Sequence, residues 1–83
     1  MHRYFFSKFY NGGCVIDDVG EECTSDADAR RRAVEALPSA ALDASSDLNG
    51  KGAYSIHVTD ETGRLVFIAT LSLFPLDQKT TNL

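Results

Sequence analysis

Two strand-rich segments, each divided by a turn, flank a single helical segment, and this order constrains the fold of the 83-residue chain more than any other feature. The strand-rich segments cover residues 3–16 and 54–74. Between them, apolar residues recur at helical spacing from Ala27 to Ala41. Because one helix covers one face of a sheet, the pattern predicts an α+β fold in the order β-β-α-β-β, with a four-stranded antiparallel sheet and the helix packed on one face.

Glycine-containing turns divide each strand-rich segment. The run Asn11-Gly12-Gly13 tolerates positive φ and separates a strand over 3–10 from a short strand over 14–16. Residues 17–20 are expected to form a type I turn that leads to a stub of strand at 21–23. Residues 60–63 form the turn of the second hairpin, between strands over 54–59 and 64–74.

The helical segment has a clear start and an ambiguous end. Ser25 is the expected N-cap, with Asp28 three residues later in a capping-box arrangement. Pro38 falls inside the periodic pattern, where a proline removes a hydrogen bond at a cost of about 3 kcal/mol. We therefore expect a helix to about Leu37, followed by a short turn of helix to about Ala44.

The length and the composition indicate one globular domain. We assign residues 1–76 to a single α+β domain and residues 77–83 to a flexible tail. No apolar run reaches 18 residues, so no membrane-spanning helix is expected. The aromatic N-terminus is interrupted by Ser7 and Lys8 and does not resemble a signal peptide, which favours a cytoplasmic location.

The first and last strands carry bulky apolar residues at both odd and even positions, and so on both faces of the sheet, whereas one helix covers only one face. A leftover apolar patch on a small domain usually marks an interface. We therefore expect a self-associating protein-interaction module, with a homodimer as the default and a different protein partner as the other possibility. Spacing alone does not decide which face meets the helix. The interface candidates are Tyr4, Phe6, Tyr10, Val66, Ile68 and Phe74.

The charge balance argues against a nucleic-acid reader. The net charge is −4 and the isoelectric point is about 4.9, whereas such proteins usually present a basic face. The run Arg30, Arg31 and Arg32 is nevertheless a candidate for phosphate contact. The alternative function is therefore a small antitoxin-like or regulator-like protein that contacts nucleic acid.

The pattern does not indicate an enzyme, a metal site or a cofactor. His57 lies on the polar side of its expected strand and is interpreted as solvent-facing. Cys14 and Cys23 are expected to be free thiols, although a tight turn over 17–20 would bring them close enough to bridge on oxidation. Together with His2 they lack the spacing of zinc ligands, and neither glycine-rich run has the pattern of a phosphate-binding loop.

Several short stretches resemble a family of small proteins, found mainly in alphaproteobacteria, that carry a domain of unknown function. They are the opening Met1-His-Arg-Tyr-Phe-Phe6, the turn Asp18-Val-Gly-Glu21, the run Ala36-Leu-Pro38 and the hairpin Ile56-His-Val-Thr-Asp-Glu-Thr-Gly-Arg64 with the following Val66-Phe-Ile-Ala-Thr-Leu71. The resemblance covers residues 1–74. It implies a bacterial, cytoplasmic, single-domain protein and brings no catalytic residue, cofactor or partner with it.

Overall fold

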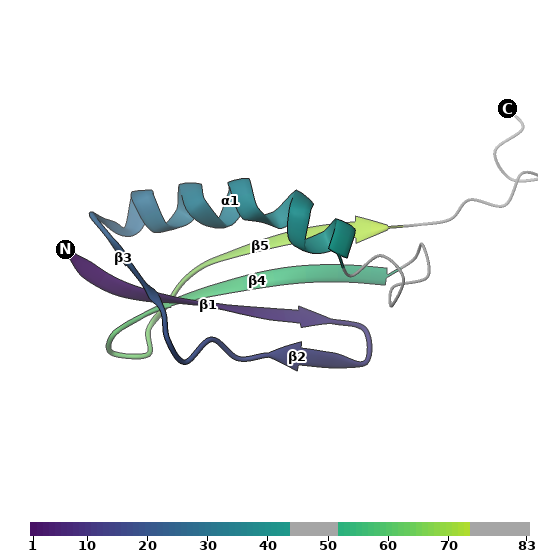
Figure 1. Cartoon of the computed structure of the whole chain (residues 1–83), viewed down its shortest axis with the longest axis horizontal. Helices are drawn as coiled ribbons and strands as arrows, with labels where there is room; N and C mark the ends of the chain where they lie inside the picture. The colour runs from purple at the N-terminus through teal and green to yellow at the C-terminus, as the bar shows by residue number, and fades with distance from the viewer. Residues whose placement is uncertain (44–51, 74–83) are drawn as a thin grey trace, which may run out of the picture.

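The computed structural model describes residues 1–43 and 52–73, and it is an α+β fold with one helix and an antiparallel sheet (Figure 1). The expected tail at 77–83 and the side chain of Phe74 lie outside the described residues. The elements in chain order are β1 (His2–Tyr10), β2 (Gly13–Val15), β3 (Glu21–Cys23), α1 (Asp26–Asp43), β4 (Gly52–Asp60) and β5 (Leu65–Leu73).

The sheet has five strands in four positions. The order is β2-β1-β4-β5, and β3 pairs with the same outer edge of β1 as β2 does. β2 pairs with residues 8–10 of β1 and β3 pairs with residues 2–4, so the two short strands follow one another along that edge. The expected turn between them is therefore not a hairpin turn, because β2 and β3 run in the same direction and do not pair with each other.

The helix covers one face of the sheet and packs mainly on β4 and β5 (Figure 1). Ala29 and Ala33 are fully buried on the helix side. Small side chains at these two positions allow the helix backbone to approach the sheet closely. Under the helix, the face with Tyr4, Phe6, Tyr54, Ile56 and Val58 forms the core.

Pro38 lies inside one continuous helix from Asp26 to Asp43, so the expected break near Leu37 is wrong. A proline inside a helix is tolerated where tertiary packing compensates for its missing hydrogen bond. That packing comes from Leu37, Ala40 and Ala41, which contact or belong to the core on either side of the proline. The start is as predicted, because the Ser25 hydroxyl accepts a hydrogen bond from the backbone N–H of Asp28 at 3.1 Å.

The second sheet face is not covered by α1. Register and alternation place Phe9, His57 and Ile68 on it, with Ile68 directly beside His57 and Phe9 diagonally across from His57. The aromatic ring of Phe9 lies 4.2 Å from the ring of His57, so His57 is half-buried against a neighbour rather than simply solvent-facing. Hydroxyl side chains alternate with these residues. We call this surface the open face; it comprises Phe5, Ser7, Phe9, Ser55, His57, Thr59, Ile68 and Thr70.

Candidate functional site

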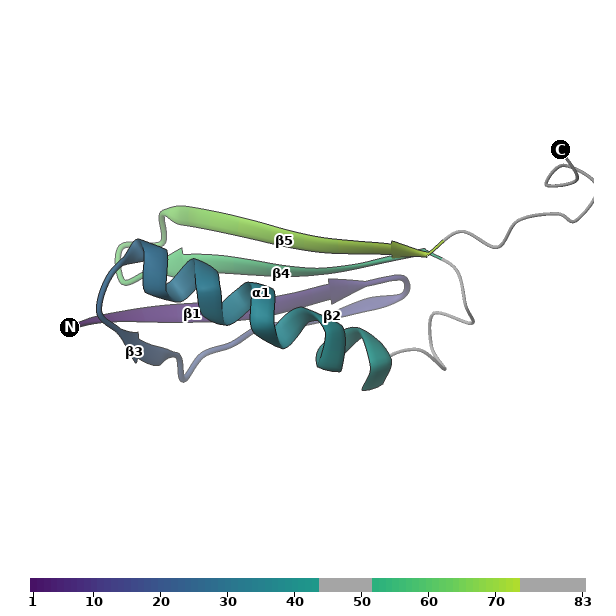
Figure 2. The ribbon, with the colours of Figure 1, turned by 90° about the horizontal axis from the view of Figure 1, so that it is seen from above.

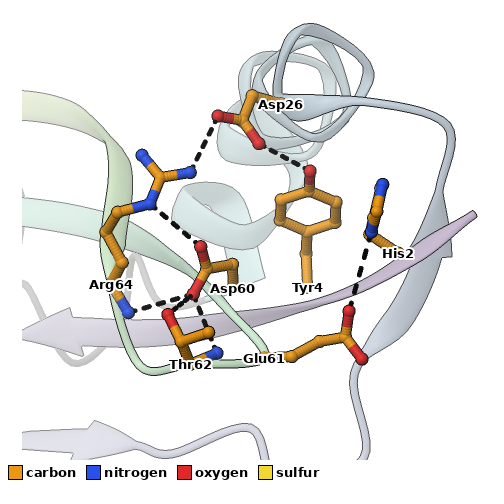
Figure 3. A pocket seen from close by; sticks show the side chains of 7 residues that line it. All are labelled: His2, Tyr4, Asp26, Asp60, Glu61, Thr62 and Arg64. Carbon is orange, nitrogen blue, oxygen red and sulfur yellow. Dashed lines mark hydrogen bonds and ion pairs between the residues drawn. The ribbon is translucent and has the colours of Figure 1, made fainter.

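A pocket of about 310 Å³ opens at the end of the sheet where the β4–β5 hairpin meets the start of α1 (Figure 3). Its centre is Arg64, which follows the hairpin turn. The Arg64 guanidinium reaches Asp26 on α1 and Asp60 at the end of β4, each at 3.0 Å. The Tyr4 hydroxyl donates to the other carboxylate oxygen of Asp26 at 2.6 Å. Side chains from β1, α1 and the hairpin thus join in one network, which we call the Arg64 cluster: Tyr4, Asp26, Asp60, Thr62 and Arg64.

The hairpin turn places Arg64 by using the Asp60 carboxylate as a local acceptor. Asp60 Oδ1 accepts hydrogen bonds from the backbone N–H groups of Thr62 and Arg64 and from the Thr62 hydroxyl. Gly63 closes the turn with φ of 87° and donates its N–H to the Asp60 carbonyl. The predicted hairpin turn is therefore present, and an aspartate at its first position organises it.

The electrostatics of the Arg64 cluster keep every member in its ordinary charge state. The hydrogen bond to Asp26 raises the pKa of Tyr4 to about 12, so its phenol stays protonated. The same hydroxyl and the Arg64 guanidinium lower the pKa of Asp26. Bonds from Thr62 lower the pKa of Asp60 to about 2. Neighbouring Asp26 and Asp60 raise the pKa of Arg64 further.

This arrangement is suited to holding elements together. Each carboxylate in the Arg64 cluster accepts bonds from a cation, a hydroxyl or an amide, and the cation is shared between two carboxylates. His2 and Glu61 complete the wall of the pocket, with 3.7 Å between His2 Nδ1 and Glu61 Oε1. Within residues 1–43 and 52–73, no three His, Cys, Asp or Glu side chains converge as a metal site requires.

Asp17 is a second organising carboxylate, and it explains how β2 and β3 share one edge. Its carboxylate accepts the backbone N–H groups of Phe6, Val19 and Gly20 at 2.9–3.0 Å. Its own N–H donates to the Ser7 hydroxyl. Burial raises the pKa of Asp17, but the three amide donors outweigh it and leave the pKa below its usual value. The sequence predicts only a turn at Asp17, and the bond from its carboxylate to the Phe6 amide joins residues eleven positions apart, beyond the reach of local patterns.

The predicted phosphate-contact arginines do not act as a unit. Arg31 pairs with Asp28 at 2.7 Å and with Glu35 at 2.9 Å. Arg32 pairs with Glu21 of β3 at 3.4 Å and with Asp28 at 3.5 Å. Arg30 is exposed. Two of the three guanidinium groups are therefore already neutralised by carboxylates.

The five interface candidates within the described residues do not form one surface. Tyr4 and Phe6 are buried under α1, and Val66 packs against the same core. Tyr10 is half-buried and its ring stacks on the ring of Tyr54 with 5.8 Å between centroids. Ile68 is 45% exposed on the open face, because the sheet register sets it beside His57. The physical reason is that β1 meets the helix with its even-numbered side chains, whereas β5 does so with Phe67, Ala69 and Leu71.

The two cysteines are far apart, so a disulfide between Cys14 and Cys23 cannot form in this fold. Cys14 pairs with Phe9 and Cys23 pairs with His2, at opposite ends of β1. Phe9 and His2 are seven positions apart along the strand, which corresponds to about 23 Å at about 3.3 Å per residue. A disulfide requires Cα atoms within about 7 Å. Cys14 is exposed and Cys23 is buried, and both are free thiols.

Exposed apolar side chains gather along β5 and the adjacent side of α1. Leu42 and Pro38 of the helix face Leu71 and Leu73 of β5 across an apolar groove of about 290 Å³. Val34 lies four residues before Pro38 and so shares its side of the helix. We call this surface the β5 margin. It comprises the exposed residues Val34, Pro38 and Leu42 of α1 and Leu65, Ile68 and Leu71 of β5, with Ile68 on the open face of that strand.

Of the residues in the β5 margin, Ile68 was predicted from the sequence as an interface candidate, whereas the helical residues were not. The spacing of Val34, Pro38 and Leu42 by four residues was a usable signal, because it marks one side of a helix. The assumed break at Pro38 concealed it.

The fold is a small one-helix α+β domain, in which the Arg64 cluster connects β1, α1 and the β4–β5 hairpin. Residues 3–72 match a family model described as a domain of unknown function (DUF6894). The match spans nearly the whole chain, from β1 to β5, and the protein belongs to this family. No curated protein and no solved structure matches the chain. In the described residues, the structure contains no helix with the length and apolar character that a membrane crossing needs.

Proposed function

We propose that this protein is a small protein-interaction module that associates with a second copy of itself and has no catalytic role. The observation that carries the proposal is the β5 margin. Pro38 and Leu42 of the helix face Leu71 across an apolar groove, and Ile68 lies on the open face of the same edge strand, so these side chains follow one edge of the sheet. Contiguous exposed apolar surface on a small domain is characteristic of an interaction site.

The energetic argument follows from the size of the chain. A domain of this length buries only about 60% of the surface of its unfolded chain, so association supplies burial that the monomer lacks. At about 25 cal/mol per Å² of apolar area, covering about 400 Å² contributes about 10 kcal/mol before the costs of association. That amount is comparable with the whole stability of a small domain.

We also propose a cytoplasmic location, and two further observations support this location and the non-catalytic role. The charged side chains of the Arg64 cluster pair with one another, which suits a network that holds elements of the fold together. The free thiols of Cys14 and Cys23 suit a reducing compartment such as the cytoplasm. The nucleic-acid alternative has less support, because Arg31 and Arg32 are held by carboxylates.

The solution mass tests the proposal. Light scattering across the micromolar range should give twice the monomer mass of 9.1 kDa, with dissociation on dilution. A mass of 9.1 kDa at the highest concentration, without binding of an apolar dye, would contradict self-association. A shift of labelled RNA or DNA that weakens with salt would instead favour the nucleic-acid alternative.

A further inference from the structure

We propose that two copies join edge to edge, through antiparallel pairing of β5 with β5, to form one continuous sheet with both helices on the same face. This inference rests on the proposed self-association and specifies its geometry. It excludes the other arrangement available to such a fold, in which two sheets pack through their open faces.

The outer edge of β5 is available for pairing. Among residues 1–43 and 52–73, β5 pairs with β4 alone, and it is the outermost strand on its side of the sheet (Figure 2). The strand is nine residues long. An edge strand of this length presents a row of unpaired backbone N–H and C=O groups, which is a template for another strand.

The strand also lacks the features that normally protect an edge. The sequence of β5 from Leu65 to Leu73 contains no charged residue and no proline. The opposite edge differs, because its two strands are three residues each and the intervening segment is folded onto β1 by Asp17. The fold thus protects one edge and leaves the other open.

Charge determines which edge of the sheet a second copy of the chain can use. The protein has a net charge of −4, so two copies repel unless they meet at an uncharged surface. β5 is such a surface, whereas the opposite edge would set like charges against each other. The acidic residues on or between the strands of that opposite edge are Asp17, Asp18, Glu21 and Glu22.

The sequence of β5 is compatible with pairing to itself. A two-fold axis beside Ala69, the middle residue of the strand, would pair all nine residues. Leu71 of one copy would then lie opposite Phe67 of the other on the helix face, and Ile68 would lie opposite Thr70 on the open face. In each pair an apolar side chain that is exposed in the monomer, Leu71 or Ile68, would contact the second copy.

The open face is a poorer site for a second copy. Hydroxyl groups lie between its apolar residues, and Ser55 and Thr70 bond to each other across it at 3.0 Å. Its aromatic rings already have intramolecular neighbours, because Phe9 contacts His57 and the ring of Phe5 approaches Gly20. Face-to-face packing would therefore bury polar groups for a limited gain in apolar contact.

Charge insertion distinguishes the two arrangements. Leu71→Lys places one charge per copy on the helix face beside the proposed axis, and the dimer dissociation constant should rise at least about 100-fold. Val15→Lys is the matched control, since it introduces the same charge at an exposed apolar position on the opposite edge, and its dissociation constant should stay unchanged. His57→Lys charges the centre of the open face and should leave the dimer intact. If Leu71→Lys does not fold, Thr70→Lys replaces it at an exposed position on β5. Because Thr70 also lies on the open face, loss of that dimer supports edge pairing only if His57→Lys stays dimeric.

Backbone hydrogen exchange provides an independent readout. Pairing through the edge should protect amides of β5 in the wild-type dimer relative to the monomeric lysine variant, while amides of β2 exchange alike in both. A dimer that persists in Leu71→Lys and dissociates in His57→Lys, without added protection of β5, would overturn edge pairing and leave self-association standing. A wild-type monomer at every concentration would overturn both.

Discussion

Gly20 lies where the segment between β2 and β3 returns to the edge of β1, and replacing it with alanine tests how tightly that segment is packed. Its φ is +77°, in the left-handed region, and a Cβ there would lie 2.7 Å from the carbonyl oxygen of Tyr4. That Cβ would also lie 3.0 Å from the side chains of Arg3 and Phe5. Because the nearest atom belongs to the backbone of a central strand, rotation of a side chain cannot relieve the contact.

The magnitude has two parts. An alanine in the left-handed region costs about 1–2 kcal/mol, of which up to about 1 kcal/mol is regained because the unfolded chain has less freedom. The steric overlap adds about 1–3 kcal/mol, the usual cost of overpacking. We therefore expect Gly20→Ala to lower the free energy of unfolding by about 2–4 kcal/mol. The Asp17 hydrogen bonds should weaken with it, since Gly20 donates its N–H to that carboxylate.

Gly63→Ala is the matched control for this prediction. Gly63 has φ of +87°, also left-handed, but a Cβ there would meet nothing within 4 Å. It should lose about 1 kcal/mol through backbone strain alone. Urea unfolding of both variants at one protein concentration, with unchanged m-values, measures the difference. Equal losses within about 0.5 kcal/mol would refute the argument that the segment between β2 and β3 is packed against β1.

Three further predictions concern the helix, the open face and acid stability. Pro38→Ala should stabilise the fold by up to about 3 kcal/mol in urea unfolding by restoring a helical N–H donor, and a lower midpoint would contradict it. His57→Ala should lower the free energy of unfolding by about 0.5–1.5 kcal/mol, because it removes the contact with Phe9. An unchanged free energy of unfolding would show that this contact does not stabilise the fold. The pKa values of Asp28 and Asp60 are lowered to about 2. Their ionised forms thus stabilise the fold above about pH 4, and this contribution is lost as the pH falls from about 4 to about 2. Asp60→Asn should flatten that part of the stability profile, and an unaltered acid transition would count against the role of Asp60.

The local elements of this protein could be predicted from its sequence because short-range chemistry determines them. Gly12 and Gly63 adopt the positive φ that their turns require. Ser25 caps the helix through its own side chain, three residues from the amide that it binds. The alternation in β4 from Tyr54 to Val58 identifies a strand with one buried side. Each of these features depends on residues that are neighbours along the chain, so one sequence is sufficient to indicate them.

The tertiary structure decided the features that depend on residues distant in sequence. Asp17 binds the Phe6 amide eleven positions away, and this contact sets β2 and β3 along one edge of β1 instead of against each other. Arg64 reaches Asp26 across 38 positions and ties the hairpin to the helix. Apolar residues occur at both parities of β1 and β5, so periodicity could not choose the buried face. Packing made that choice, because buried alanines let α1 lie close over the large side chains of one face, and the same placement left the edge of β5 open.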